Sequence, residues 1–161
     1  MLIRKATAEE MLALWGYDAN TAPPTARFFY DNISGGNAVF WAADSGGELI
    51  GELYAFLELE DKAFADGESV AYLCAFRVKC EYRGQGHGGM LMAAALADLK
   101  ERGFCRATIG VAYDEPRNIS LYRRMGFTRK IRDCHYDPCA MDEKMQPLYD
   151  ENAWQLLSKK L

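Results

Sequence analysis

The sequence predicts a single α/β (α+β) domain built on a mixed sheet with helices packed on it. Strand–turn–strand signals come first in the chain and strand–helix–strand units follow, which is the order of such a layered domain. The chain has 161 residues, half of them apolar, which is the size of one ordinary domain with a sizeable core. We therefore treat residues 1–161 as one domain, without internal repeats.

The first half of the chain alternates extended and helical signals. Thr7 can cap a helix whose first turn carries two acids, which suits the helix dipole. Residues 23–25, Pro-Pro-Thr, can start a second helix that Gly35 and Gly36 close. The turn at 44–47 separates two strand-like runs, which predicts a hairpin. The expected elements are a strand at 2–6, helices at 7–16 and 23–35, and strands at 38–43 and 48–57.

The second half contains a strongly apolar strand and a strand–helix–strand unit. Residues 69–78 are apolar nearly throughout, as in a central strand buried on both faces. A glycine-rich loop follows and opens an apolar helix, for which Gly103 is the expected C-cap. The expected elements are strand 69–78, helix 90–102, strand 107–113, a short helix that Asn118 caps and that ends at 125–126, strand 127–134, and a tail at 152–161 that fits either a strand or a helix.

Composition and charge exclude several classes of protein. The formal net charge is −4, which argues against broad nucleic-acid binding, because such binding needs a concentrated basic face. No apolar run reaches the roughly 18 residues of a membrane span, and the N-terminus lacks the apolar stretch of a signal peptide. We expect a cytoplasmic protein with no nucleic-acid or membrane partner, and a homodimer stays open.

The cysteines indicate neither a disulfide framework nor a zinc ribbon. There are five, an odd number, and no CxxC pair occurs. The one local cluster of potential metal ligands, at 134–139, matches no common zinc spacing. We predict no metal site, and we expect this segment to be a strand end that runs into a Pro-containing loop.

The loop Arg83–Gly89 predicts a phosphate-binding site. Four glycines lie within six residues there, between a buried strand and a helix. Such a turn leaves backbone N–H groups free at the positive end of a helix, and the missing side chains let a phosphate approach closely. A pyrophosphate is the ligand that we expect at this loop. Arg83 adds positive charge, and His87 either touches a phosphate or faces solvent.

The same loop satisfies G-x-G-x-x-G, so a dinucleotide-binding fold is an alternative. Asp114 and Glu115 follow the next strand, roughly where a ribose-binding acid would lie. Three facts disfavour this fold. The unit begins about 70 residues into the chain, the four residues 80–83 lie between the strand and the first glycine, and only 72 residues follow Gly89.

Two stretches resemble the signatures of the GNAT acetyltransferase superfamily. Residues 78–88, Val-Lys-Cys-Glu-Tyr-Arg-Gly-Gln-Gly-His-Gly, are similar to Gln/Arg-x-x-Gly-x-Gly/Ala after a strand that ends in Val. Residues 121–127, Leu-Tyr-Arg-Arg-Met-Gly-Phe, resemble Leu-Tyr-x-x-x-Gly-Phe. The order of elements agrees over most of the chain. The resemblance implies the acyl-CoA N-acyltransferase fold, a mixed, mostly antiparallel twisted sheet with helices on both faces.

The resemblance also implies an N-acetyltransferase that moves an acetyl group from acetyl-CoA to a primary amine of a small molecule or peptide. The reaction would be direct attack in a ternary complex, with Tyr122 protonating the departing thiolate. The family often has an Asn seven residues before this Tyr. Here that position is Glu115, so Asn118 is a shifted ligand or, as we favour, only a helix cap. The residues implied for the donor are Phe76, Arg77, Val78, Arg83, Gly84, Gln85, Gly86, His87, Gly88, Gly89 and Asn118.

The chemistry needs an acid and a base, and only the acid has a clear candidate. A phenol and a thiol have similar pKa values, about 10 and 8.5, which suits Tyr122 as the acid. For the base we choose Glu68, because it begins the central strand. The other carboxylates on the expected acceptor side are Glu52, Glu58, Glu60, Asp61 and Asp66.

The acceptor is expected to be cationic. The segment 58–68 holds five acids and one Lys, which can attract a cationic amine, although such a run is more often a solvated loop. The N-terminal helices, with Trp15, Phe28, Phe29 and Tyr30, should form the acceptor wall by the resemblance. Because no base is assigned, a catalytically weak CoA-binding sensor or regulatory module stays as the alternative function.

Overall fold

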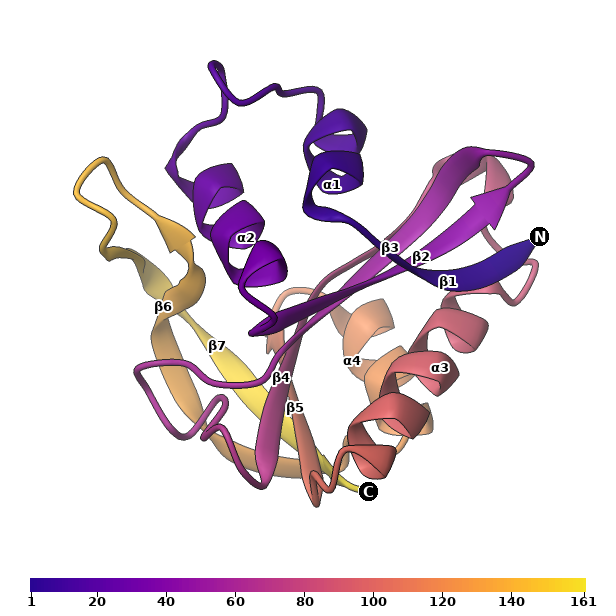
Figure 1. Cartoon of the computed structure of the whole chain (residues 1–161). Coiled ribbons are helices and arrows are strands. Elements are labelled where there is room, and N and C mark those ends of the chain that lie inside the picture. The colour runs from indigo at the N-terminus through magenta and orange to yellow at the C-terminus, as the bar shows by residue number, and fades with distance from the viewer.

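A computed structural model describes residues 1–161 and places one seven-stranded sheet at the centre of the molecule (Figure 1). The strand order is β1-β2-β3-β4-β5-β7-β6. Only β4 and β5 run parallel, and every other neighbouring pair is antiparallel. The elements are β1 (Leu2–Ala6), α1 (Ala8–Trp15), α2 (Pro24–Ser34), β2 (Ala38–Ser45), β3 (Glu48–Phe56), β4 (Val70–Val78), the 3₁₀ turn η1 (Cys80–Tyr82), α3 (His87–Glu101), β5 (Arg106–Ala112), α4 (Pro116–Arg124), β6 (Arg129–Met141) and β7 (Pro147–Lys160).

Helices cover both faces of the sheet, and each face has its own apolar core. Leu91 and Leu99 of α3 pack with Tyr122 of α4 on one face. Met11 of α1 and Phe29 of α2 pack on the other. Full burial of an apolar side chain of this size contributes about 1.5–3 kcal/mol, so the two cores hold α1 and α2 firmly opposite α3 and α4. This confirms the predicted mixed sheet with helices on both faces.

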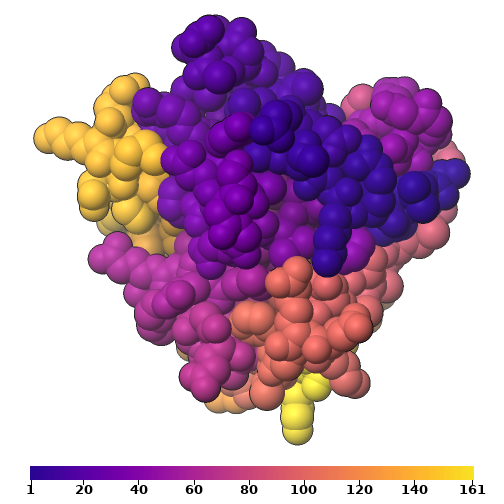
Figure 2. Space-filling view, in the orientation of Figure 1, coloured from indigo at the N-terminus to yellow at the C-terminus, as the bar shows by residue number.

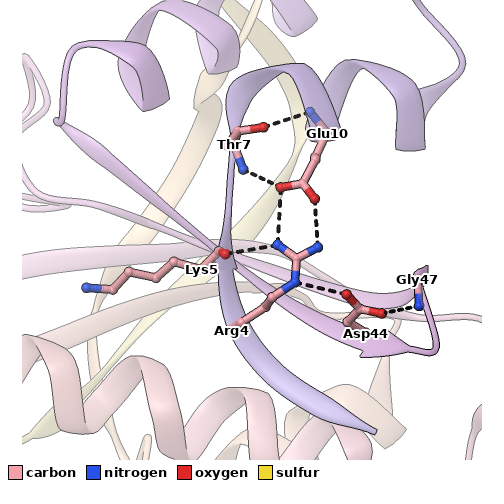
Figure 3. A network of polar contacts seen from close by, with 6 residues as sticks. All are labelled: Arg4, Lys5, Thr7, Glu10, Asp44 and Gly47. Carbon is pink, nitrogen blue, oxygen red and sulfur yellow. Dashed lines mark hydrogen bonds and ion pairs between the residues drawn. The ribbon is translucent and has the colours of Figure 1, made fainter.

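The first helix is anchored to the sheet by Arg4. Its guanidinium donates to Glu10 Oε1 at 2.6 Å and to Asp44 Oδ2 at 2.9 Å (Figure 3). Glu10 and Thr7 form the capping box that starts α1. The Arg4 hydrogen bonds lower the pKa of Glu10 to about 2. The contacts of Arg4 thus join β1, the start of α1 and the β2–β3 hairpin.

The parallel strands β4 and β5 separate halfway along their length. Their pairing ends at Leu73 and Ile109. Ala75 then has a φ of 50°, in the left-handed region, and the register between β3 and β4 shifts between Glu52 and Tyr54. A bulge of this kind bends its strand and re-aims the side chains. The last five residues of β4 therefore pair with β3 but leave their other edge free.

Two predicted boundaries were wrong in the second half of the chain. The apolar helix begins at His87, three residues before Met90, because Gly86 adopts the left-handed cap conformation with φ 87°. The strand predicted at 127–134 is longer, since β6 continues through Pro138 to Met141. The register shift between Asp137 and Met141 accommodates the proline, so the predicted loop is part of a strand.

The C-terminal segment is a strand, and the short helix before β6 is capped differently from the prediction. β7 pairs with both β5 and β6, which removes the helical alternative for the tail. α4 begins at Pro116, a residue favoured in the first turn of a helix. Asn118 consequently lies inside the helix rather than at its N-cap. No helix of the chain is both long and apolar enough to cross a bilayer.

The β6–β7 turn projects next to α2 (Figure 2). The Met141 N–H donates to the Thr25 hydroxyl at 3.0 Å, which joins the end of β6 to the start of α2. The helices α1 and α2 and the end of β6 therefore surround the free edge of β4.

Candidate functional site

A cleft of about 750 Å³ runs along the free part of β4. Four of the residues predicted to hold the donor line it, namely Phe76, Arg77, Val78 and Arg83. The opposite walls come from α1, α2 and the second half of β6. The wall residues are Leu14, Trp15, Tyr17, Thr25, Phe29, Asp137, Cys139 and Ala140.

The glycine-rich loop presents a row of unused amides beside this cleft. Among the backbone hydrogen bonds of the protein, none has a donor between Gly84 and Gly89. A Cβ added at Gly84, Gly86 or Gly89 would meet no atom within 4 Å, so the space next to these residues is clear. Six successive N–H groups at the positive end of α3 form a site that suits an anion.

The side chains of the loop hold its position relative to β4. Arg83 Nε donates to the Val78 carbonyl at 2.8 Å. The backbone at Gly88 lies against Phe76, because a Cβ there would be 3.1 Å from the Phe76 ring. His87 is half-buried, and its Nδ1 is covered and has no hydrogen-bond partner. The structure thus brings the glycine loop and the free end of β4 together, as the sequence predicts.

Tyr122 lies on the α3–α4 side of the same strand. It is 8 % exposed, and its ring centroid is 6.4 Å from that of Phe76. Burial, with a smaller contribution from Glu115, raises the pKa of Tyr122 to about 12. The phenol is therefore protonated throughout the neutral range and remains a hydrogen-bond donor beside β4.

The structure does not bring Glu68 or Asn118 to the cleft. Glu68 is exposed and precedes β4 at the end opposite the bulge, and Asn118 is exposed on α4. Their place in the chain suggested the site, but β4 starts after Glu68, at Val70, and its residues that line the cleft begin only at Cys74. Neither residue lines the cleft.

The acid run at 58–68 is largely occupied by internal partners. Glu58 pairs with Lys62 at 2.9 Å, and Asp61 forms an ion pair with Arg132 and accepts from Tyr136. Asp66 accepts hydrogen bonds from three backbone N–H groups and a serine hydroxyl. These interactions stabilise the β3–β4 connection, and none of the run lines the cleft.

Among the carboxylates considered as the base, Glu52 is the one that lines the cleft. It is 6 % exposed. Its Oε1 lies 2.7 Å from Arg77 Nε, while Oε2 accepts from Trp15 Nε1 at 2.9 Å and from the Tyr54 hydroxyl at 2.7 Å. A carboxylate has about four acceptor positions, so roughly one remains on Oε1. The sequence analysis named Glu52 but preferred Glu68.

A signal for Glu52 was present in the strand pattern. It lies among the apolar residues 49–57, six of which the structure buries together with Glu52 itself. A charged residue in such a run is buried only when it is paired. Of the four aromatic residues expected at the acceptor wall, Trp15 and Phe29 line the cleft. Phe28 stacks on Phe56 instead, and Tyr30 donates to Glu9.

Comparisons with known proteins agree with this geometry. A family model described as the acetyltransferase (GNAT) family matches residues 4–127, which include both sequence signatures. The chain is 30% identical over 103 residues to a mycothiol acetyltransferase of Cellulomonas flavigena, with 63% of this chain and 30% of that protein covered. It is 28% identical over 105 residues to N-acetyltransferase 8 of Rattus norvegicus, with 65% and 44% covered. The chain thus spans less than half the length of these curated relatives.

Solved structures share the fold over nearly the whole chain. The ribosomal-protein-S18-alanine N-acetyltransferase of Escherichia coli superposes with a TM-score of 0.69 at 16% identity, covering 99% of this chain and 92% of that one. A GNAT family acetyltransferase of Elizabethkingia anophelis with acetyl-CoA bound has a TM-score of 0.66 at 19% identity, covering 99% and 97%. With the family model matching 4–127, the chain belongs to the acetyltransferase (GNAT) family.

Proposed function

We propose that this chain transfers an acetyl group from acetyl-CoA to a primary amine of a small molecule or peptide, by direct attack in a ternary complex. The observation that carries the proposal is the continuity of the unused amides at Gly84–Gly89 with the free edge of β4 at Phe76–Val78. One site suits a pyrophosphate and the other suits an amide-containing chain, and CoA contains both groups in that order.

The donor would lie across these two sites. The amides of the loop bind the pyrophosphate, Arg83 adds a positive charge, and the pantetheine arm pairs with β4 like an added strand. The thioester then reaches the point where β4 and β5 separate. There it lies between Tyr122 on one side of the sheet and the cleft with Glu52 on the other.

The reaction requires a neutral amine and a leaving thiol. The amine nitrogen attacks the thioester carbonyl, a C–N bond forms, and the oxygen takes the negative charge of a tetrahedral intermediate. The nitrogen loses one proton to the Glu52 carboxylate, directly or through a water, and the intermediate collapses as the C–S bond breaks, giving the amide and CoA thiolate. Backbone N–H groups at the bulge of β4 can stabilise the oxyanion. Holding both reactants can contribute up to about 7–11 kcal/mol to lowering the barrier.

Glu52 replaces Glu68 in our assignment of the proton acceptor. Its remaining acceptor position on Oε1 can bind the ammonium of the substrate or a water that removes the ammonium proton. The ion pair with Arg77 holds the carboxylate in place at the cleft. A carboxylate of this kind lowers the free energy of the cationic intermediate that forms when the amine attacks.

Tyr122 donates a hydrogen bond to the leaving sulfur. A pKa of about 12 makes full transfer of its proton to a thiolate, whose conjugate acid has a pKa of about 8.5, uphill by more than three units. Tyr122 therefore stabilises developing negative charge as a donor, and the thiolate is finally protonated from solvent. The similar pKa values assumed from sequence do not hold once the ring is buried.

The test is release of CoA thiol from acetyl-CoA over a panel of primary amines, combined with calorimetric titration of acetyl-CoA and NAD. We expect acetyl-CoA to bind, NAD to give no heat, and at least one amine to raise thiol release well above hydrolysis. Binding of acetyl-CoA without turnover on any amine would instead support the CoA-binding sensor.

A further inference from the structure

A second pocket, of about 630 Å³, adjoins the cleft at the C-terminal end of β5. Residues of β5, the β5–α4 connection, β6 and β7 surround it. Asp137 lines both this pocket and the cleft, so the two spaces meet at that residue. The lining residues that the argument uses are Tyr72, Asp114, Glu115, Asp137 and Asp150.

The pocket is strongly acidic. Four carboxylates line it, on Asp114, Glu115, Asp137 and Asp150, and no Lys or Arg does. None of the four forms an ion pair, whereas nine ion pairs occur elsewhere in the protein. The nearby lysine, Lys130, is engaged by Asp133 at 3.0 Å. The pocket therefore holds negative charge that the protein itself leaves uncompensated.

Tyr72 is an independent indication that the pocket receives a polar ligand. Its side chain comes from β4, is 5 % exposed and lines the pocket. Its ring packs edge-on against Phe64 with centroids 5.1 Å apart. No side-chain hydrogen bond of the protein includes its hydroxyl, and that oxygen is not fully enclosed, so it opens into the pocket that Tyr72 lines. A largely buried tyrosine usually satisfies its hydroxyl within the protein, so this hydroxyl is free to donate to or accept from a ligand in the pocket.

We propose that the pocket of Asp114, Glu115, Asp137, Asp150 and Tyr72 binds a second ammonium group of the acceptor, and that the substrate is a small polycationic amine. This inference rests on the proposed function for the acetylated nitrogen and adds the rest of the molecule. One amine lies in the cleft near Glu52, and the chain that links the nitrogens passes Asp137. The acid run at 58–68, which first suggested a cationic substrate, has no part in it.

The charges of the pocket set how strongly it should favour a polycationic amine over a monoamine. The four carboxylates are exposed, so each ion pair with the ligand should change affinity by about two- to fivefold. Several such ion pairs together should give a larger preference for a polycationic amine over a monoamine. This preference should decline as salt rises, because the screening length falls from about 10 Å at 0.1 M to about 3 Å at 1 M.

The experiment compares α,ω-diaminoalkanes with n-alkylamines of equal length as acceptors, in the wild type and in D114N/D150N. We expect the diamines to have at least about tenfold higher kcat/KM than the monoamines, as for two or more such ion pairs. The double variant should raise KM for the diamines about 5- to 20-fold and leave the monoamines and kcat unchanged. Tyr72→Phe should raise KM for the diamines only. Glu151→Gln, a matched loss of one acid next to Asp150, should change neither.

Binding of 1,4-diaminobutane to the CoA complex, measured by calorimetry, separates this inference from the proposed function. Saturable binding that weakens in D114N/D150N supports the pocket even if no thiol is released, in which case only the proposed turnover fails. Any of three results would overturn the inference. They are equal kcat/KM for monoamines and diamines, a preference for a peptide N-terminus without further positive charge, and diamine binding that the double variant does not weaken.

Discussion

Arg77 Nε lies 2.7 Å from Glu52 Oε1, across the irregular pairing of β4 and β3. Arg77 also lies over the Trp15 ring, with 5.4 Å from its guanidinium carbon to the ring centroid. Trp15 in turn donates to the other oxygen of Glu52. Each of these three residues contacts the other two, and together they connect α1 to the free edge of β4. The acceptor wall and the donor-binding strand therefore both contact the Glu52 carboxylate.

Replacement of Glu52 tests whether this carboxylate serves the reaction. Glu52→Gln places an amide NH₂ next to groups that donate hydrogen bonds to the carboxylate in the wild type. A buried donor is then left unsatisfied, which should lower the free energy of unfolding by about 1–3 kcal/mol. If Glu52 accepts the proton or holds the ammonium, kcat/KM should fall about 10²- to 10⁴-fold, with acetyl-CoA affinity little changed. Glu48→Gln, which removes a carboxylate of an exposed pair on the same strand, is the control. A folded Glu52→Gln protein of near-normal activity would exclude both roles.

Tyr122→Phe removes only the hydroxyl and keeps the packing of the ring. We expect acetyl-CoA to bind as in the wild type and the chemical step in single-turnover experiments to slow by about 10²-fold, the low end for a proton donor. kcat and kcat/KM should fall together, as for a contact made in the transition state. Tyr149→Phe, at an exposed site, should be neutral. A chemical step within about threefold of wild type would make Tyr122 a packing residue.

The pH dependence gives Tyr122 a second test. Burial raises its pKa to about 12, so the donor form is lost only as pH rises through that value. The wild-type rate should therefore show no alkaline limb from Tyr122 below pH about 11. A limb near pH 10 that disappears in Tyr122→Phe would show that the group titrates as an exposed tyrosine in the working enzyme.

Gly86→Val tests the phosphate site. Gly86 has a φ of 87°, and a Cβ there would point into the clear space beside the loop. Valine disfavours this backbone and would fill the space that the pyrophosphate needs, so calorimetry should show loss of acetyl-CoA binding with the fold retained. Gly36→Val is a matched control, because Gly36 has a φ of 81° and equal free space but lies far along the chain. Equal loss of binding in both variants would point to backbone strain alone.

Arg4→Met tests the anchor of α1. The folded pKa of Glu10 is about 2, below its usual 4.5, so this pair adds stability above pH 4.5 that is lost as pH falls towards 2. Because Arg4 and Glu10 are 31% and 34% exposed, solvent screening limits the pair to about 0.5–1 kcal/mol. Chemical denaturation should show that deficit at pH 7 and none near pH 2. Arg27→Met, which breaks no ion pair, should give the same stability as wild type at both values.

Local chemistry determined much of this protein from the sequence. The N-cap at Thr7, the turn at 44–47, the strand at 69–78 and the glycine loop were all predicted, because each depends on residues within a few positions of one another. Tyr122 was found by its motif, and the loop and its strand were placed together because they are contiguous. The boundaries that failed, at His87 and around Pro138, depend on a left-handed cap and a register shift that composition does not reveal.

Only the tertiary structure pointed to Glu52, the proposed base, and to the acidic pocket. Glu52 and Trp15 are 37 positions apart, and Asp114, Asp137 and Asp150 come from three separate segments. Strand alternation shows that a residue can face one side of a sheet, but strand order and register determine which residues face it there. Glu68 and the run at 58–68 looked functional in the sequence because their charges are close along the chain. Folding gave most of those charges internal partners and left the four carboxylates of the acidic pocket without an ion pair, because no basic side chain lines that pocket.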